Sequence, residues 1–376
     1  MPEPALTADL TGDLVVLSHL RWMFVWQRPQ HIVSRLARHR RTWFVEEPAP
    51  APGIREPRLR VEEHGNVRRV WLEVPSDPVR GFEDSLAAEY GARLAELVGP
   101  ALDRVLWLYT PMALPVARRL GPSTLVYDVM DDLASFRCAP TELRLRHRQL
   151  LREADVVFTG GRSLHRSVLD HRSAGVHLFA SGVEPDHYAR ATALRRRGAR
   201  PIAGYVGVID ERLDLDLISD LAGRLPQWEI RMVGPVAKID RGALPRADNI
   251  VYTGAQPYDW LPEVMAELDV ALMPFALNDA TRSISPTKTL EYLAAGLPVV
   301  STRVPDVVAD YEHVVDLQDD GRGFAAACER VKDTDPAVRA RQVAPLLHRH
   351  HWDTIASRMA VLVEACEAAP RAEETA

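Results

Sequence analysis

The stretch SISPTKTLEYLAAGLPVVST at residues 283–302 has the pattern of a helix that leads directly into a buried strand. Ser285 is a favourable N-cap residue, and the proline after it fits the first helical position. Gly296 is typical of the residue just beyond a helix C-terminus. The apolar run at 299–302 then predicts a strand that is covered on both faces. These twenty positions predict one helix–strand step of a parallel α/β sheet.

Short apolar runs and helical patterns alternate through most of the chain, with a break at 187–200. Strand–helix–strand units at this spacing predict parallel sheets flanked by helices. We therefore expect an α/β protein with two doubly wound, Rossmann-like domains. The expected strands lie at 14–18, 42–45, 105–109, 125–128, 156–159, 176–180, 202–206, 229–233, 250–253, 270–274, 299–302 and 314–317. The expected parts are a first domain (1–186), a linker (187–200), a second domain (201–350) and a C-terminal helix with a frayed tail (351–376), for which a return to the first domain is one option.

A lysine stands in the first turn of the helix that is expected after Ser285. Lys288 there opposes the helix dipole, by about 0.3–1 kcal/mol at an exposed site, unless an anion is bound. Free amides of the first turn, the hydroxyls of Ser285 and Thr287 and the lysine ammonium could together surround a phosphate. Glu291 lies one turn further on, where its carboxylate could accept hydrogen bonds from a ribose diol. This arrangement suits a nucleotide diphosphate; the alternative is a solvated helix end with an ordinary i,i+3 pair.

The same stretch resembles the nucleotide-sugar motif of GT-B glycosyltransferases, especially the family-four (glycosyltransferase group 1) enzymes, most of which are retaining. The resemblance places Glu291 at the family's second glutamate, which contacts the donor ribose. The family's first glutamate, which contacts the transferred sugar, falls at Ser283. The resemblance implies a GT-B fold, with two Rossmann-like domains that face each other across a cleft.

The sequence GYVGVIDER at residues 204–212 extends this resemblance. Glycine at position 207 lets a ligand approach the backbone closely. Arg212 matches the second of two basic positions that hold the diphosphate in the family, whereas Val208 replaces the first. A tight turn with a solvated arginine is the alternative. With Thr253, whose segment resembles the one that borders the base, the implied donor site is Gly207, Arg212, Thr253, Ser285, Thr287, Lys288 and Glu291.

The loop after the first strand of the first domain is rich in aromatic and polar residues. Trp26, Gln27 and Arg28 precede a proline that favours a helix start. Aromatic faces and planar donors suit a sugar or a ring-shaped acceptor. The string WQRPQ also resembles a subgroup of bacterial family-four-like transferases. We expect these three residues to bind the acceptor; the alternative for Trp26 is packing into the domain surface.

Two further side chains are candidates for catalysis. His19 follows the first strand, where some inverting GT-B enzymes have a base; a polar packing role is the alternative. Asp131 follows another apolar strand, at a position where family-four members often have an aspartate near the acceptor. It is therefore a candidate both for catalysis and for acceptor binding, with helix capping as the alternative. We expect no metal site and no cofactor, because the metal-binding Asp-x-Asp motif belongs to the other glycosyltransferase fold.

Composition limits the partners and the location of the protein. The 376 residues include 46 basic and 52 acidic side chains, for a net charge of -6, which argues against a dedicated nucleic-acid binder. No apolar run approaches the roughly 18 residues of a membrane span, and the first residues lack the basic region of a secretory signal. The three cysteines are too far apart to form a disulfide framework. We expect a cytoplasmic protein, with peripheral membrane contact not favoured.

Together these patterns predict a glycosyltransferase that moves a sugar from a nucleotide-diphosphate sugar to a hydroxyl-bearing or other nucleophilic acceptor. A small molecule or a saccharide could be that acceptor. The resemblance favours retention of the anomeric configuration. Two alternatives stay open: a nucleotide-sugar epimerase on the same fold, and a non-catalytic partner protein with a degenerate donor site, for which Ser283 and Val208 give some support.

Overall fold

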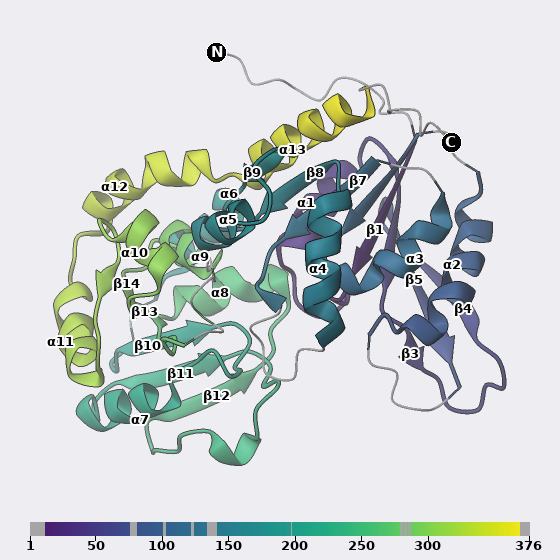
Figure 1. Ribbon diagram of the computed structural model, residues 1–376. Coiled ribbons are helices and arrows are strands. Elements are labelled where there is room, and N and C mark those ends of the chain that lie inside the picture. The colour runs from purple at the N-terminus through teal and green to yellow at the C-terminus, as the bar shows by residue number, and fades with distance from the viewer. Residues whose placement is uncertain are drawn as a thin grey trace. The chain divides into compact units, whose positions relative to one another are not determined.

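The computed structural model describes residues 12–75, 81–100, 103–121, 124–133, 141–196, 198–278, 281, 284 and 287–368. The chain divides into two compact units (Figure 1). Unit 1 comprises residues 1–160, 164–179 and 352–376, and unit 2 comprises residues 161–163 and 180–351. Each unit is an α/β structure built on its own sheet, so the predicted fold class, two Rossmann-like domains, is confirmed.

Unit 1 contains a nine-stranded sheet in the order β3-β5-β2-β1-β6-β7-β8-β9, with β4 paired to β5. All neighbours are parallel except β4 and β5, which are antiparallel. Its strands are β1 (Asp13–Ser18), β2 (Arg41–Glu46), β3 (Ala49–Pro50), β4 (Arg58–His64), β5 (Val67–Val74), β6 (Arg104–Leu108), β7 (Thr124–Val129), β8 (Val156–Thr159) and β9 (Val176–Leu178).

Helices cover both faces of this sheet, which explains why its inner strands are almost wholly apolar. Leu14 and Val16 of β1 belong to one cluster of buried residues, and Val15 and Leu17 belong to another. The first cluster includes side chains of α1 (Arg28–Leu36) and α13 (Trp352–Glu367). The second includes side chains of α2 (Asp84–Val98), α3 (Leu114–Ala117), α4 (Thr141–Glu153) and α5 (Arg162–Leu169).

The C-terminal helix α13 is part of unit 1 and packs on α1. The ring of Trp352 stacks on that of His31, with 4.9 Å between the ring centroids. Arg40, just after α1, pairs with Glu367 near the end of α13 at 2.5 Å. Arg35 of α1 also pairs with Asp353 of α13. An apolar face, one ring stack and two ion pairs therefore hold α1 and α13 together in a single core.

Unit 2 contains a six-stranded, fully parallel sheet in the order β12-β11-β10-β13-β14-β15. Its strands are β10 (Ile202–Val206), β11 (Glu229–Val233), β12 (Ile250–Gly254), β13 (Val270–Met273), β14 (Val299–Ser301) and β15 (Asp316–Leu317). Its helices are α6 (Pro185–Leu194), α7 (Leu215–Arg224), α8 (Leu261–Ala266), α9 (Thr287–Ala294), α10 (Pro305–Tyr311), α11 (Gly321–Val331) and α12 (Pro336–Arg349). The chain reverses its direction of travel across this sheet between β10 and β13, and ligands of such sheets bind at that point.

The segment expected as a linker at 187–200 is largely helical, which corrects that part of the prediction. Helix α6 covers its first half, and Tyr188 and Ala191 are buried in the core of unit 2. Pro185 at the first helical position explains the start of this helix. The sequence analysis missed this helix because the segment is basic and only these two side chains of α6 are buried.

Strands β4 and β5 form a hairpin that the sequence analysis did not predict. Burial alternates along the second half of β5, where Val70, Leu72 and Val74 are buried and the two residues between them are less so. Within the described ranges, no helix is long and apolar enough to cross a membrane.

Candidate functional site

Three glycines stand at the carboxyl ends of neighbouring strands in unit 2. Gly207, Gly234 and Gly254 follow or end β10, β11 and β12, with φ angles of 155°, 142° and 74°. The amide of Gly234 donates to the carbonyl of Gly254 at 2.8 Å. A β-carbon on Gly234 would lie 1.9 Å from the carbonyl oxygen of Gly207. A β-carbon would clash at Gly207 and Gly234, and all three positive φ angles favour glycine, so bare backbone borders the end of the sheet.

The side chain of Lys288 lies over the first of these glycines. A β-carbon on Gly207 would come within 1.9 Å of Lys288 Cε and 2.5 Å of its Nζ. The ammonium is also 5.8 Å from the centroid of the Tyr205 ring. The Tyr205 hydroxyl donates to the carbonyl of Val208 at 2.9 Å, which fixes the ring under the lysine. The ammonium of α9 is therefore held at the end of β10, beside exposed backbone.

Lys288 interacts electrostatically with Glu291, the residue predicted to bind the ribose. Burial lowers the pKa of Lys288, and the nearby Glu291 carboxylate opposes that shift. Burial raises the pKa of Glu291, while the ammonium of Lys288 and the hydroxyl of Tyr188 act in the opposite direction. The positive charge of Arg212 also lowers the pKa of Lys288. Two cations, Lys288 and Arg212, and two carboxylates, Glu291 and Asp210, thus share one partly buried site.

Arg212 is oriented by a buried carboxylate two residues before it. Its Nη2 and Nε atoms donate to Asp210 at 2.7–3.1 Å, and its backbone amide donates to the same carboxylate at 3.1 Å. The Asp210 side chain is 4% exposed, whereas that of Arg212 is 25% exposed. The guanidinium is therefore fixed on one side and reaches solvent on the other.

A tyrosine anchors helix α9 to β10. The hydroxyl of Tyr292 accepts a hydrogen bond from the amide of Val206 at 2.8 Å and donates to its carbonyl at 3.2 Å. Tyr292 is fully buried. Because Lys288 and Glu291 lie on the same two turns as this anchor, their position at the strand end is set by the backbone of β10.

The sequence analysis missed the part of this site that comes from α6. Tyr188 of that helix is near the carboxylate of Glu291. Tyr258 stacks on His187 with 4.2 Å between ring centroids, and its hydroxyl donates to the carboxylate of Glu184. In the sequence, the aromatic residues of the segment expected as a linker were the only sign that it contributes to this site.

The remaining donor-site predictions are distributed around this centre. Thr287 is the first residue of α9 and is half-buried, and Thr253 is exposed on β12, next to the glycine row. The structure thus brings together Gly207, Arg212, Lys288 and Glu291. Thr287 and Thr253 lie at the edges of this group. Ser285 lies outside the described residues, as does Ser283.

In unit 1, three of the four predicted acceptor residues are engaged in contacts within the domain. Trp26 is half-buried, and its Nε1 donates to His31 at 3.1 Å. Gln27 is the N-cap residue of α1, and its backbone amide donates to the side chain of Gln30 at 3.1 Å. Arg28 is 4% exposed and lies inside the domain, where it forms an ion pair with Asp128 at 3.0 Å. Its Nη1 also donates to the carbonyl of Phe179 at 2.7 Å.

The two predicted catalytic residues occupy separate positions in unit 1. His19 is half-buried in the bend just after β1. Asp131 follows β7 and lines a small pocket together with Tyr127 and His147, whose side chains hydrogen bond at 2.8 Å. Burial lowers the pKa of His147, although the neighbouring Asp132 opposes this. Among the residues that the structure describes, no group of three or more His, Cys, Asp or Glu side chains could hold a metal ion.

Comparisons with known proteins agree with this geometry. Residues 200–333, which include β10 to α11, match the family described as glycosyl transferases group 1. The chain is also 30% identical over 206 residues to TuaH of Bacillus subtilis (strain 168), which is named as a teichuronic acid biosynthesis glycosyltransferase. That match covers 49% of this chain and 50% of TuaH, so the chain spans about half the length of this curated relative.

Solved structures resemble almost the whole chain. Sucrose-phosphate synthase from Thermosynechococcus elongatus is 17% identical, with a TM-score of 0.68 and coverage of 96% of this chain and 100% of its own. Anabaena HepE, solved in complex with UDP and glucose, is 15% identical, with a TM-score of 0.66 and coverage of 94% and 100%. A UDP-forming trehalose-phosphate synthase from Burkholderia xenovorans, in complex with glucose-6-phosphate, gives the same four values.

At these identities, the solved structures establish the fold, and the sequence match of unit 2 establishes the resemblance to the group. The resemblance predicted from the motif around Lys288 is therefore confirmed. The chain has the GT-B fold, and its residues 200–333 match the glycosyl transferases group 1.

Proposed function

We propose that this protein is a glycosyltransferase that takes a sugar from a nucleotide-diphosphate sugar bound to unit 2. One observation carries the proposal: the ammonium of Lys288 lies over the bare backbone of Gly207, with Glu291 one helical turn away. Close backbone approach and a fixed cation are what a diphosphate requires. A carboxylate at that distance along the helix suits the ribose hydroxyls.

The two cations have a direct role in the proposed reaction. When the bond between the sugar and the diphosphate breaks, negative charge develops on the departing phosphate oxygen. Lys288 and Arg212 would stabilise that charge, and their anchoring by the Tyr205 ring and by Asp210 means that little reorganisation is needed. These cations are the reason why we propose transfer without a metal or another cofactor.

The identity of the donor is proposed from relatives. HepE was solved with UDP and glucose, which makes UDP the first nucleotide to test. The resemblance to a mostly retaining group supports transfer with retention of the anomeric configuration. We propose that unit 1 binds the acceptor, with Trp26, Gln27, Arg28 and Asp131 as the predicted contacts and His19 or Asp131 as the candidate catalytic groups.

Calorimetric titration with UDP, GDP, dTDP and ADP tests the donor site. We expect one nucleotide to bind the wild type well, and Lys288→Ala and Glu291→Ala each to weaken that binding by about 1–3 kcal/mol, as for lost charged hydrogen bonds. Lys332→Ala is the matched control. That lysine is the C-cap residue of α11, outside the proposed site, and is paired with Glu329. If none of the nucleotides binds, the alternative of a non-catalytic partner protein replaces this proposal.

A turnover assay separates the transferase from the epimerase. The nucleotide that binds best is supplied as its sugar donor, with and without a panel of sugar acceptors, and the products are followed by proton NMR. We expect nucleotide release that depends on an acceptor, and a product with the anomeric configuration of the donor. Conversion of the donor sugar without any acceptor would identify an epimerase instead.

A further inference from the structure

The loop between β1 and α1 exposes two large apolar side chains, while polar groups near its end are engaged in contacts within unit 1. Trp26 is bonded to His31, and Arg28 is bonded to Asp128, so neither presents its polar atoms freely to a ligand. Met23 and Phe24 of the same loop are 61% and 55% exposed. Isolated surface hydrophobics need no explanation, but two adjacent large ones in a fixed loop do.

A buried carboxylate holds this loop from one side. Glu46, the last residue of β2, is fully buried and accepts a hydrogen bond from the backbone amide of Trp22 at 2.7 Å. It also pairs with Arg21 at 3.2 Å and with Arg69 at 2.8 Å. Two arginines pair with this buried carboxylate while it holds the backbone of the loop.

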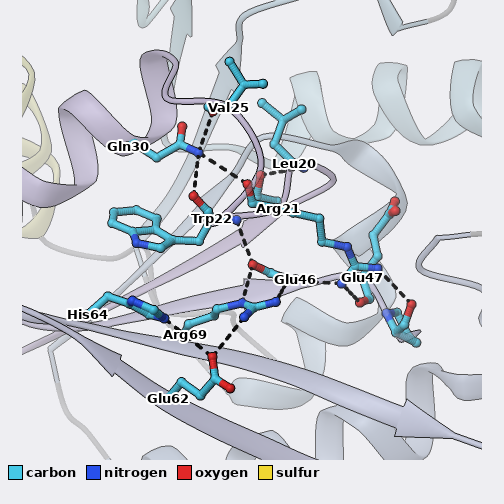
Figure 2. A network of polar contacts seen from close by, with 12 residues as sticks. Leu20, Arg21, Trp22, Val25, Gln30, Glu46, Glu47, Glu62, His64 and Arg69 are labelled. Atoms are coloured by element: carbon cyan, nitrogen blue, oxygen red, sulfur yellow. Dashed lines mark hydrogen bonds and ion pairs between the residues drawn. The ribbon is translucent and has the colours of Figure 1, made fainter. Parts of the chain in front are cut away.

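A buried amide holds the loop from the other side. The Nε2 atom of Gln30, the third residue of α1, points to the carbonyl oxygens of Arg21, Trp22 and Val25, at 3.4, 3.2 and 3.0 Å. Figure 2 shows the Gln30 amide and the Glu46 carboxylate on opposite sides of Trp22. The two exposed residues, 23 and 24, are therefore presented by a clamped backbone and not by a loose one.

The position of the loop in unit 1 indicates what it meets. The chain leaves β1 towards β2 on one side and later reaches β6 on the other, so the carboxyl ends of β1 and β6 form the point at which the strand order reverses. The amide of Tyr109, just after β6, donates to Leu17 of β1 at 2.9 Å, which closes the two ends together. Ligands of open α/β sheets bind at this point.

We propose that Met23 and Phe24 contact an apolar portion of the acceptor, so that this protein prefers an acceptor sugar attached to an alkyl or aryl group over the free sugar. The inference rests on the proposed function, in which unit 1 binds the acceptor. The clamp supports it, because side chains on an ordered backbone lose less conformational entropy when they bind. Glu46 and Gln30 act in this proposal as positioning residues.

A matched pair of probes tests this preference without requiring turnover. Octyl β-D-glucopyranoside, below its critical micelle concentration, and methyl β-D-glucopyranoside carry the same sugar and differ only in the apolar chain. Binding of each is measured by calorimetry to the wild type, Met23→Ser, Phe24→Ser and Val338→Ser. Val338 is an exposed apolar residue of α12 and serves as the control.

We expect the wild type to bind the octyl glucoside at least about tenfold more tightly than the methyl glucoside, since an alkyl chain would bury apolar surface. Each loop substitution should reduce this ratio by about threefold or more, and the control should leave it unchanged. Equal binding of the two probes by the wild type would overturn the proposal, as would a preference that both loop variants retain.

A third variant tests the clamp. Glu46→Gln removes the charge that both arginines need, so we expect faster amide hydrogen exchange in residues 19–27 and a smaller octyl preference. Faster exchange throughout unit 1 would instead show a general loss of stability, and Glu46 would then not be a positioning residue. UDP titration of the same variants distinguishes the two proposals, because UDP binding depends on unit 2. A lost octyl preference with unchanged UDP binding supports the inference, whereas failure of UDP binding in the wild type contradicts the proposed function alone.

Discussion

Lys288 lies so close to Gly207 that no other residue can occupy position 207 without moving the lysine. The β-carbon of any other residue would be 1.9 Å from Lys288 Cε, well inside the contact distance of two carbon atoms. The φ angle of 155° also disfavours a side chain there. The glycine therefore serves two purposes at once: it leaves room for the ammonium, and it leaves the backbone open to a ligand.

This relationship predicts that Gly207→Ala acts through Lys288. We expect the variant to bind UDP at least about tenfold more weakly, because the lysine side chain must leave its place. Lys288→Ala added to Gly207→Ala should cause little further loss, since residues that act through one contact are not additive. Calorimetry on the two single variants and the double variant measures this coupling.

Gly223→Ala is the control for this series. Gly223 lies in α7, and a β-carbon there would meet no atom within 4 Å. Alanine is favoured over glycine inside a helix, so this variant should bind UDP as the wild type does and unfold no more easily. Full additivity of Gly207→Ala and Lys288→Ala would show that the glycine acts independently of the lysine.

Variants of Arg212 and Asp210 distinguish the effect of this ion pair on UDP binding from its effect on stability. Arg212→Ala removes a cation from the proposed diphosphate site and leaves a buried carboxylate without its ion-pair partner. We therefore expect weaker UDP binding together with a lower free energy of unfolding. The double variant Arg212→Ala/Asp210→Ala should recover much of the stability, because the unpaired charge is gone, but none of the affinity.

Urea unfolding and UDP titration of the same three proteins measure both quantities. Recovery of UDP binding in the double variant would mean that Arg212 contributes only by neutralising Asp210. In that case, the cation at the donor site would be Lys288 without assistance from this loop.

Strong local patterns explain which parts of the fold could be predicted from the sequence. The expected strands at 202–206 and 229–233 have the bounds of β10 and β11, because short, mostly apolar runs between helical patterns give a clear signal for parallel strands. The centre of the candidate donor site could also be predicted from the sequence. Lys288 and Glu291 belong to one helix, and Gly207 and Arg212 belong to one loop. Their position at neighbouring strand ends follows from the parallel order of the sheet.

The features that were missed depend on contacts between distant residues. Nothing local in Arg28 shows that its partner is Asp128, one hundred residues later. The same is true of Tyr188, whose neighbour Glu291 lies on a different helix. The hairpin of β4 and β5 was missed because its charged residues pair across the strands, as with Arg69 and Glu62, and so conceal the alternation of buried positions.

The buried pair of Arg28 and Asp128 gives a prediction about stability. Both side chains are almost fully buried, at 4% and 0% exposed. Arg28→Ala leaves an unpaired carboxylate inside unit 1, which costs about 3–5 kcal/mol of unfolding free energy. Urea unfolding measures this loss. Arg144→Ala, at an exposed position of α4, is the control and should stay within about 0.5 kcal/mol of the wild type.

The outcome also decides how Arg28 could take part in acceptor binding. A large loss of stability would agree with a structural role for the guanidinium. A normal unfolding free energy together with weaker acceptor binding would instead support the acceptor contact that was predicted from the sequence.

Glu47, directly after the buried Glu46, gives a prediction about pH. Burial raises its pKa from 4.5 to about 7, although the guanidinium of Arg21 opposes this shift. A β-carbon on Gly81 would lie 2.8 Å from the Glu47 carboxylate, which shows how closely the chain packs against it. Because the folded state holds this proton more tightly than the unfolded state, the folded protein loses stability as the pH rises from about 4.5 to 7.

Glu47→Gln removes this titration, so the variant should gain about 1–3 kcal/mol over the wild type between pH 5 and pH 8. Urea unfolding at several pH values measures the difference. Glu56→Gln, at an exposed position, is the control and should show no such gain. If the difference between Glu47→Gln and the wild type stays constant with pH, then Glu47 is ionised in the folded state throughout this range, and the close packing of Gly81 against it does not exclude water.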